Sequence, residues 1–245
     1  MRQSRTEVVA DGFLALILDG TYPPGASLPS EAVLAERFEV SRLTVREAIR
    51  SLASTRVIDV QQGKSSVVNP VDRWSPLDPR LLQARGQASG QPLLLPRRLI
   101  EARRTVEVGV TELAATRRTD EHLARMASFL DRMKLAHADS DLDRFVEADL
   151  AFHATLFEAV DNVFIDALFE PLTAVLRTLR ATTSAVPEIR EHAIAWHARV
   201  LAAVTEGDPG PAREAMRGHL MQTEEDADQY LTPRDQAAAA GVPPR

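Results

Sequence analysis

The sequence predicts a mainly α-helical protein with two domains, of which only the first contains strands. Residues 1–70 combine helical periodicity with two short alternating segments, whereas apolar residues beyond residue 97 recur only at helical spacing. Prolines and glycines divide that later part into segments of helical length. At 245 residues, with 44% hydrophobic and 26% charged residues, the chain is long enough for two globular domains.

Three helices are predicted in the N-terminal segment. The first covers residues 6–19 and ends at a turn rich in glycine and proline. Ser30 is a suitable N-cap for a second helix that ends near Phe38, and Ser41 caps a third that ends near Ala53. On the third helix, apolar residues at i, i+3, i+4 and i+7 form one stripe, which consists of Val45, Ala48, Ile49 and Leu52.

The opposite face of that third helix carries guanidinium and hydroxyl groups that suit a DNA major groove. It consists of Arg42, Leu43, Thr44, Arg46 and Arg50. An amphipathic helix pair with outward arginines is also common in proteins that do not bind DNA. Residues 55–60 and 66–68, however, alternate like two strands joined by a Gly-Lys turn. A helix pair followed by such a hairpin predicts a winged helix-turn-helix, with the hairpin tip against the DNA.

Residues 23–52, PPGASLPSEAVLAERFEVSRLTVREAIRSL, and the following VIDVQQGKSSVV resemble the N-terminal domain of GntR-family bacterial transcription regulators. The shared pattern is a PPG, an LPSE, a VSR-x-TVREA and a glycine-containing wing. The resemblance implies DNA contacts from Ser41, Arg42, Thr44, Arg46, Gln62 and Gly63. Three places depart from the pattern. Ala32 stands where many members have arginine, Thr55-Arg56 replaces the usual glycine before the first wing strand, and Ser65-Ser66 stands where Gly-Thr is common.

The charge distribution restricts how this domain binds DNA. The chain has a formal net charge of −6, yet residues 1–70 contain eight basic and eight acidic residues, and residues 37–64 contain six basic and three acidic ones. A small basic patch on an acidic protein does not coat DNA nonspecifically. Two such patches acting together favour a homodimer, and the resemblance implies a double-stranded, two-fold symmetric operator.

Composition excludes several other classes. The chain has no cysteine, so disulfides and thiolate metal sites are impossible. No apolar run approaches the roughly 20 residues that a membrane span needs. Residues 1–10 contain no apolar segment typical of a secretion signal. We therefore expect a cytoplasmic protein without a membrane partner.

The second domain is expected to be an antiparallel all-α bundle. A linker over residues 71–96, with a short helix at 78–86, should connect it to the residue 1–70 domain. Within residues 97–231 the breakers predict helices at 97–118, 119–138, 141–160, 162–183, 188–206 and 208–231. Together with the short helix this gives a bundle of about seven helices. Residues 232–245, with four consecutive alanines, are expected to form a disordered tail.

One carboxylate and three imidazoles lie within the predicted helices of this bundle. Asp149 and His153 are i, i+4 neighbours and project from one helix face, and His197 and His219 lie near the middle of the last two helices. Such a set of ligands fits Zn²⁺, Ni²⁺, Mn²⁺ or Fe²⁺ with positions left open. An Asp-x-x-x-His pair on a helix is more often a solvated or capped pair, so the spacing alone leaves both interpretations open.

Residues 97–231 also resemble a known domain, the FCD ligand-binding domain of the FadR-type branch of GntR regulators. The stretches that carry the resemblance are EARRTVEVGVTELAATRRTDE, DLAFHATLFEAVDN and WHARVLAAVTEGDPGPAREAMRGHL. The resemblance implies a divalent metal ion, zinc first, with nickel, manganese or iron as alternatives, held by Asp149, His153, His197 and His219. It further implies a small carboxylate effector, with Arg103 and Asn162 as effector-binding residues. An N-cap is the other role open to Asn162.

We therefore predict a ligand-responsive transcription regulator, a repressor, and not an enzyme. The segment Leu77-Asp78-Pro79 favours a sugar acid such as an aldonate as the effector. One alternative is a metal-dependent, hydrolase-like enzyme in which the ion activates water. That alternative has no evident general base near the predicted ligands and leaves the winged helix unexplained. In two further alternatives the metal is itself the signal, or it is purely structural.

Overall fold

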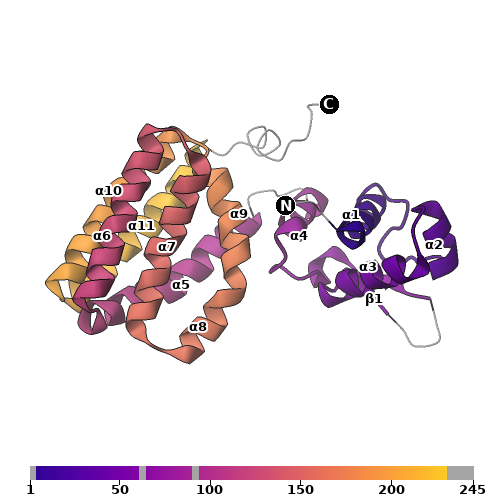
Figure 1. The fold of residues 1–245 in the computed structure, drawn as a ribbon, viewed down its shortest axis with the longest axis horizontal. Helices are drawn as coiled ribbons and strands as arrows, with labels where there is room; N and C mark the ends of the chain where they lie inside the picture. The colour runs from indigo at the N-terminus through magenta and orange to yellow at the C-terminus, as the bar shows by residue number, and fades with distance from the viewer. Residues whose placement is uncertain (1–3, 61–64, 90–93, 231–245) are drawn as a thin grey trace. The chain divides into compact units, whose positions relative to one another are not determined.

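The computed structural model describes residues 4–60, 65–89 and 94–230. The chain divides into two compact units, residues 1–92 and 93–245. Helices dominate both units, and the strands that are described all belong to the first (Figure 1). The predicted mainly α-helical class is therefore confirmed. The predicted tail at residues 232–245 lies outside the described part of the chain.

Three helices open the first unit, and each begins at a serine. They are α1 Arg5–Leu18, α2 Glu31–Arg37 and α3 Arg42–Ser54. The hydroxyl oxygens of Ser4, Ser30 and Ser41 each accept a hydrogen bond from the backbone N–H three residues later. These bonds satisfy N–H groups that have no partner within the helix. The N-caps predicted at Ser30 and Ser41 are confirmed.

The wing is a short antiparallel hairpin. Its strands are β1 Ile58–Asp59 and β2 Val67–Val68, with Ile58 opposite Val68. Both strands are shorter than predicted, because the regular ladder covers only two residues on each side. An isolated bridge from Ser27 to Val67 adds the segment before α2 to the other side of β2. The start of α2 is thereby tied to the wing.

The turn between α3 and β1 places a non-glycine residue in the left-handed region. Arg56 has a φ of 60°, a conformation that glycine adopts at no steric cost. Asn69 donates from Nδ2 to the carbonyl oxygen of Arg56 at 3.0 Å, and Trp74 donates from Nε1 to the carbonyl oxygen of Asn69 at 3.0 Å. The turn therefore keeps the shape of a glycine turn although an arginine occupies it.

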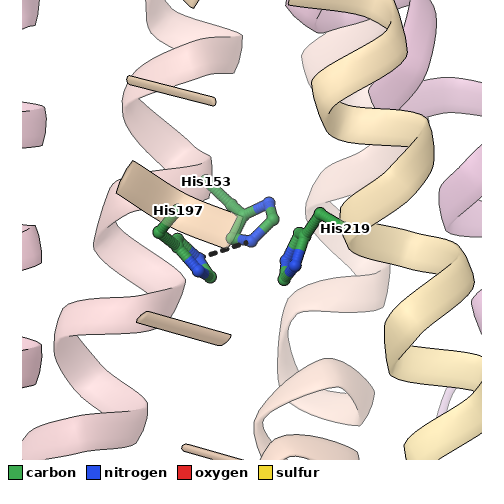
Figure 2. Close-up of side chains that lie close together, drawn as sticks. All are labelled: His153, His197 and His219. Carbon is green, nitrogen blue, oxygen red and sulfur yellow. Dashed lines mark hydrogen bonds between the residues drawn. The ribbon is translucent and has the colours of Figure 1, made fainter. Parts of the chain in front are cut away.

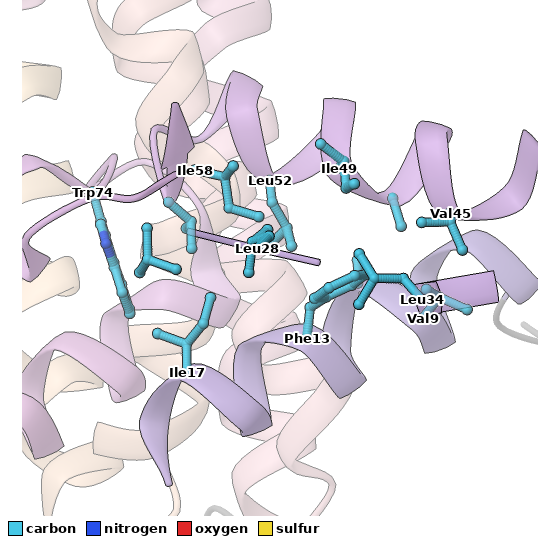
Figure 3. Packing of buried hydrophobic residues seen from close by; sticks show 14 of the residues in the cluster. Val9, Phe13, Ile17, Leu28, Leu34, Val45, Ile49, Leu52, Ile58 and Trp74 are labelled. Carbon is cyan, nitrogen blue, oxygen red and sulfur yellow. The ribbon is translucent and has the colours of Figure 1, made fainter. Parts of the chain in front are cut away.

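One apolar core holds the first unit together (Figure 3). Its members include Val9, Phe13, Ile17, Leu28, Leu34, Val45, Ile49, Leu52 and Ile58. Trp74, Leu81 and Ala84 belong to the same cluster. They lie in or beside the 3₁₀ helix η1 (Val71–Arg73) and helix α4 (Pro79–Ser89). This part of the expected linker is therefore packed onto the first unit.

The second unit is a helical bundle (Figure 1). Its elements are α5 Leu94–Arg117, α6 Asp120–Ala138, α7 Leu142–Val160, α8 Val163–Phe169, η2 Glu170–Leu172, α9 Thr173–Thr183, α10 Pro187–Glu206 and α11 Pro209–Tyr230. The five long helices form a ring in which α5 contacts α7, α7 contacts α6, α6 contacts α10, α10 contacts α11 and α11 contacts α5. The shorter α9 packs against α7 from outside this ring.

Two predicted boundaries were wrong, and both involve proline. Helix α5 begins at Leu94, so Pro96 lies in its first turn, where a missing N–H costs nothing. The single helix predicted over residues 162–183 is two helices separated by η2, which contains Pro171. A proline in a helix interior removes one hydrogen bond and clashes with the preceding turn. The second unit thus has seven described helices, though not the seven that were predicted.

Candidate DNA-binding surface and metal centre

Helix α3 presents basic side chains to solvent on the face opposite its buried apolar stripe. The exposed residues of this face are Arg42, Leu43, Arg46 and Arg50. Thr44 is half-buried, and its hydroxyl lies 2.9 Å from that of Ser41, the helix N-cap. The predicted contacts on α3 therefore share one accessible face. Gln62 and Gly63, the predicted wing contacts, lie outside the described residues.

Arg46 on this face is held by an acidic residue of α2. Its Nε donates to Oε1 of Glu31 at 2.9 Å, and its Nη2 donates to Oε2 at 2.7 Å. These hydrogen bonds from Arg46 hold the pKa of the Glu31 carboxyl below its usual range. The Arg46 side chain remains 50% exposed. A fork–fork pair fixes the plane of a guanidinium, so Glu31 orients the predicted DNA contact.

Three histidines from three helices meet inside the second unit (Figure 2). His153 lies on α7, His197 on α10 and His219 on α11, and all three are buried. One ligand nitrogen of each lies within 4.8 Å of those of the other two. The structure therefore brings together three of the four predicted metal ligands.

Oxygen atoms close to Nδ1 favour one tautomer in two of these rings. His197 Nδ1 lies 2.6 Å from the carbonyl oxygen of Ala193, and His153 Nδ1 lies 2.6 Å from Oε2 of Glu107. Both Nδ1 atoms face acceptors and so carry the protons, which leaves lone pairs on the Nε2 atoms. Yet those two Nε2 atoms lie only 3.1 Å apart. The buried Nε2 of His219 has no hydrogen-bond partner among the described residues.

Burial favours the neutral form of two of these rings, His197 and His219. It holds the pKa of His197 well below the ordinary value, and neighbouring His153 lowers that pKa further. Burial likewise lowers the pKa of His219, with a further contribution from His197. A divalent cation would satisfy the lone pairs that face one another in this cluster. The donor set of neutral imidazoles fits such an ion.

Two buried ion pairs complete the centre. Asp149, the fourth predicted ligand, places Oδ1 3.1 Å from Nε2 of His197 and Oδ2 against Nη1 of Arg180. Arg103 donates from Nε to Oε1 of Glu107 at 2.7 Å. Burial raises the pKa of Glu107, but the charge of Arg103 and the neighbouring His153 outweigh it, so the pKa lies below its usual range. The buried charges, two positive and two negative, cancel before any ion binds.

A close helix contact sets the position of two of the histidines. A Cβ atom added at Gly218 on α11 would lie 2.3 Å from Cη2 of Trp196 on α10. Trp196 precedes His197, and Gly218 precedes His219. The absent side chain at Gly218 therefore lets α10 and α11 approach closely enough to bring these imidazoles together.

A cavity of about 240 Å³ opens beside the cluster, between α7 and the segment α8–α9. Its buried polar lining consists of Glu107, His153 and Arg180. Its apolar walls are Leu150, Phe157, Phe169 and Leu176, and the rings of Phe157 and Phe169 stack with centroids 4.3 Å apart. A small molecule in this cavity would contact both the histidine cluster and a buried guanidinium.

Comparison with known families accounts for both units. The family described as "Bacterial regulatory proteins, gntR family" matches residues 5–68, and the FCD domain matches residues 98–222. The chain belongs to the GntR family. Its second unit is the FCD domain of that family, and the resemblance found in the sequence is confirmed.

Relatives in the GntR family cover most of the chain. The transcriptional regulator LutR of Bacillus subtilis is 30% identical over 88% of this chain and 98% of its own length. The galactonate operon transcriptional repressor of Escherichia coli is 33% identical over 66% of this chain and 70% of its own length. The solved structure of Lar from Listeria monocytogenes has a TM-score of 0.66 over 94% of this chain and all of that one, at 18% identity, and it supports the fold alone.

These findings make this GntR-family chain a transcription regulator with a DNA-binding winged helix-turn-helix and an FCD effector-binding domain. Its relatives are regulators, not enzymes. Every described helix is too short or too polar to span a bilayer.

The two predicted effector-binding residues have other partners in this GntR-family protein. Arg103 is buried in its pair with Glu107 and does not line the cavity. Asn162 caps α8, because its Oδ1 accepts from the backbone N–H groups of Phe164 and Ile165 at 3.0 and 3.4 Å. Their contact with an effector stays a prediction. Arg180 is the arginine that lines the cavity.

Proposed function

We propose that this protein is a repressor that leaves its operator when a small carboxylate binds at a metal centre in the FCD domain. The observation that carries the proposal is the convergence of lone pairs on His153, His197 and His219 beside a cavity lined by Arg180. Such a site offers an anionic ligand both a metal ion and a guanidinium.

The charge of the centre favours an anion. Arg103 and Arg180 balance Glu107 and Asp149, and His197 and His219, which burial favours in the neutral form, add no charge. A divalent ion held by the three histidines and Asp149 would leave the buried site with an excess charge of two. A bound carboxylate would offset part of it. Zinc suits this nitrogen and oxygen donor set, and nickel, manganese and iron are the alternatives.

For DNA binding, the protein acts as a homodimer on a two-fold symmetric operator. The residues that contact the DNA are Ser41, Arg42, Thr44, Arg46, Gln62 and Gly63. One relative is by name a repressor, of the galactonate operon. For the carboxylate to release DNA, it must bind the form of the dimer with low operator affinity more tightly than the other form.

Metal analysis combined with operator binding tests the proposal. DNA selected from a random pool would serve as operator, in fluorescence anisotropy with zinc-loaded and EDTA-treated protein. We expect stoichiometric metal, and operator release by a small carboxylate only when metal is present. Release on chelation alone, with no acid added, would instead make the metal the signal. Metal-independent release by an acid would remove the metal from the mechanism.

A further inference from the structure

The cavity beside the metal centre has chemically distinct parts, which bear on the kind of carboxylate it takes. The inference below rests on the proposed effector function. At its buried end lie Glu107, His153 and Arg180, and Arg180 Nε is buried with no hydrogen-bond partner among the described residues. An unpaired buried guanidinium N–H is costly unless something accepts from it. The buried end is therefore where a carboxylate oxygen fits.

The middle of the cavity offers little to a hydroxyl group. Its walls are Leu150, Phe157, Phe169 and Leu176. Phe157, Phe169 and Leu176 are all buried, and none of the four has a polar side-chain atom. A polyhydroxylated chain would lose its hydrogen bonds to water there and gain few in return. An alkyl chain or ring would gain from burial along the same path.

The charged residues in the exposed part of the lining are all acidic. This part consists of Ala154, Glu158, Asp166, Glu170 and Thr173, of which Glu158 pairs with Arg125. Neither Asp166 nor Glu170 forms an ion pair among the described residues. A second carboxylate at the far end of a ligand would meet two uncompensated negative charges at this mouth. The mouth therefore disfavours dicarboxylates.

We infer that the effector is a monocarboxylate with an apolar body, bound carboxylate-first, and not a sugar acid or a dicarboxylate. The cavity volume of about 240 Å³ lies below the range of about 300–1,000 Å³ typical of ligand pockets, which fits a small acid. The inference differs from the sugar acid expected from the Leu77-Asp78-Pro79 segment, which lies in the first unit and not in this cavity.

A series of acids on the full-length, zinc-loaded protein tests the inference by isothermal titration calorimetry. From acetate through butanoate to hexanoate, affinity should rise by about fourfold for each methylene buried. Gluconate and adipate have the same six carbons as hexanoate but add hydroxyls or a second carboxylate. Both should bind at least about tenfold more weakly than hexanoate.

A substitution in the apolar wall of the cavity and a matched substitution on the surface test whether the ligand's alkyl chain lies in the cavity. Leu150→Asn should weaken hexanoate binding and leave acetate binding unchanged, because acetate is too short to reach the wall. Leu135→Asn, at an exposed leucine of α6 outside the cavity, should change neither.

The outcomes separate this inference from the function on which it rests. If gluconate binds as tightly as hexanoate, or if affinity does not rise with chain length, the effector does not have an apolar body. A carboxylate effector as such would still be supported. If none of the five acids binds and none alters operator affinity, the carboxylate function and this inference fail together.

Discussion

In the proposed function, Arg180 is the residue that would make the histidine cluster an anion site. It lies against Asp149 with one guanidinium nitrogen while Nε stays without a partner, and it lines the cavity. The sequence contained a sign of this placement. Arg180 falls four residues after Leu176 and one after Leu179, on the buried stripe of α9, whereas Arg177 falls outside that stripe. Helical periodicity thus predicts that Arg180 is buried and Arg177 exposed, which composition alone does not.

We predict that Arg180→Gln weakens acetate binding to the zinc-loaded protein by roughly 1.5–3 kcal/mol, the contribution of a hydrogen bond to a charged group. Operator binding without acid should be unchanged, because Arg180 lies in the second unit. Calorimetry with acetate measures the first quantity and anisotropy the second. Arg177→Gln, at an exposed arginine of the same helix, is the control and should bind acetate normally. Equal losses in both variants would remove Arg180 from the anion site.

The pH dependence of stability without metal reports the buried histidines. Burial lowers the pKa of His197 and His219 in the folded protein, whereas both should titrate near 6.5 when unfolded. The unfolded state then binds more protons below about pH 6.5, so the free energy of unfolding should fall as pH decreases. The slope should reach at most about 1.4 kcal/mol per pH unit for each histidine. Urea denaturation in EDTA between pH 8 and 5 checks this. A flat profile would mean that the rings are not buried as neutral groups.

The helix boundaries that a capping side chain sets were predicted correctly from the sequence. Those that depend on the surroundings of a proline were predicted wrongly. The serines at 30 and 41 marked their helices correctly because the capping hydroxyl is local chemistry. Pro96 and Pro171 have the same side chain, yet one opens α5 and the other interrupts a helix. Which of these a proline does depends on tertiary packing. The bridge from Ser27 to Val67 likewise joins distant residues that carry no pairing pattern.

Two glycines in helices should respond oppositely to alanine. Gly218→Ala would push a methyl group into Trp196, and overpacking of this kind costs about 1–3 kcal/mol. Gly109→Ala on α5 meets no atom within 4 Å and should stabilise by roughly 0.5–1 kcal/mol, since alanine favours the helix. Thermal unfolding of both variants measures the difference. Gly218→Ala should also bind zinc more weakly, and unaltered metal affinity would show that α10 and α11 need no close approach.

The contact between α2 and α3 predicts a role for Glu31 in operator recognition. Arg46→Ala should abolish specific operator binding. Glu31→Gln should reduce the ratio of operator to nonspecific affinity about tenfold, because it frees the guanidinium fork that carries the discrimination. An exposed ion pair contributes little to stability, so thermal unfolding should change little. Glu36→Gln, at an exposed acid of the same helix, is the control. An unchanged specificity ratio in Glu31→Gln would exclude the orienting role.

For the molecule as a whole, the sequence predicted which residues form the candidate metal site, but it did not predict the cavity beside that site. Asp149, His153, His197 and His219 were grouped through a family resemblance, and the fold places them side by side. The cavity could not be predicted, because the wall opposite α7 comes from α8 and α9, whose separation at Pro171 was missed. Its volume depends on packing that no local pattern encodes.

A neutral DNA-binding domain makes dimer formation a testable requirement. Residues 1–70 have no net charge, so one domain alone should bind an operator weakly. Light scattering should give twice the mass of one chain, and operator affinity should fall when protein is diluted below the dimer dissociation constant. Tight, specific binding by a monomer would contradict this view. The mass of the denatured protein, which is that of one chain, is the reference for this comparison.

The two sides of the cavity come from helices that differ in whether they carry candidate metal ligands. Helix α7 supplies Asp149 and His153 together with Leu150 and Phe157, so changes there risk losing the ion. The opposite side, from Phe169 to Leu176, contributes no histidine. Ligand preference could therefore change through mutation of residues of α8 and α9 other than Arg180 while α7 stayed the same. The end of α7 at Val160 separates the helix that carries two of the candidate metal ligands from the opposite wall of the cavity.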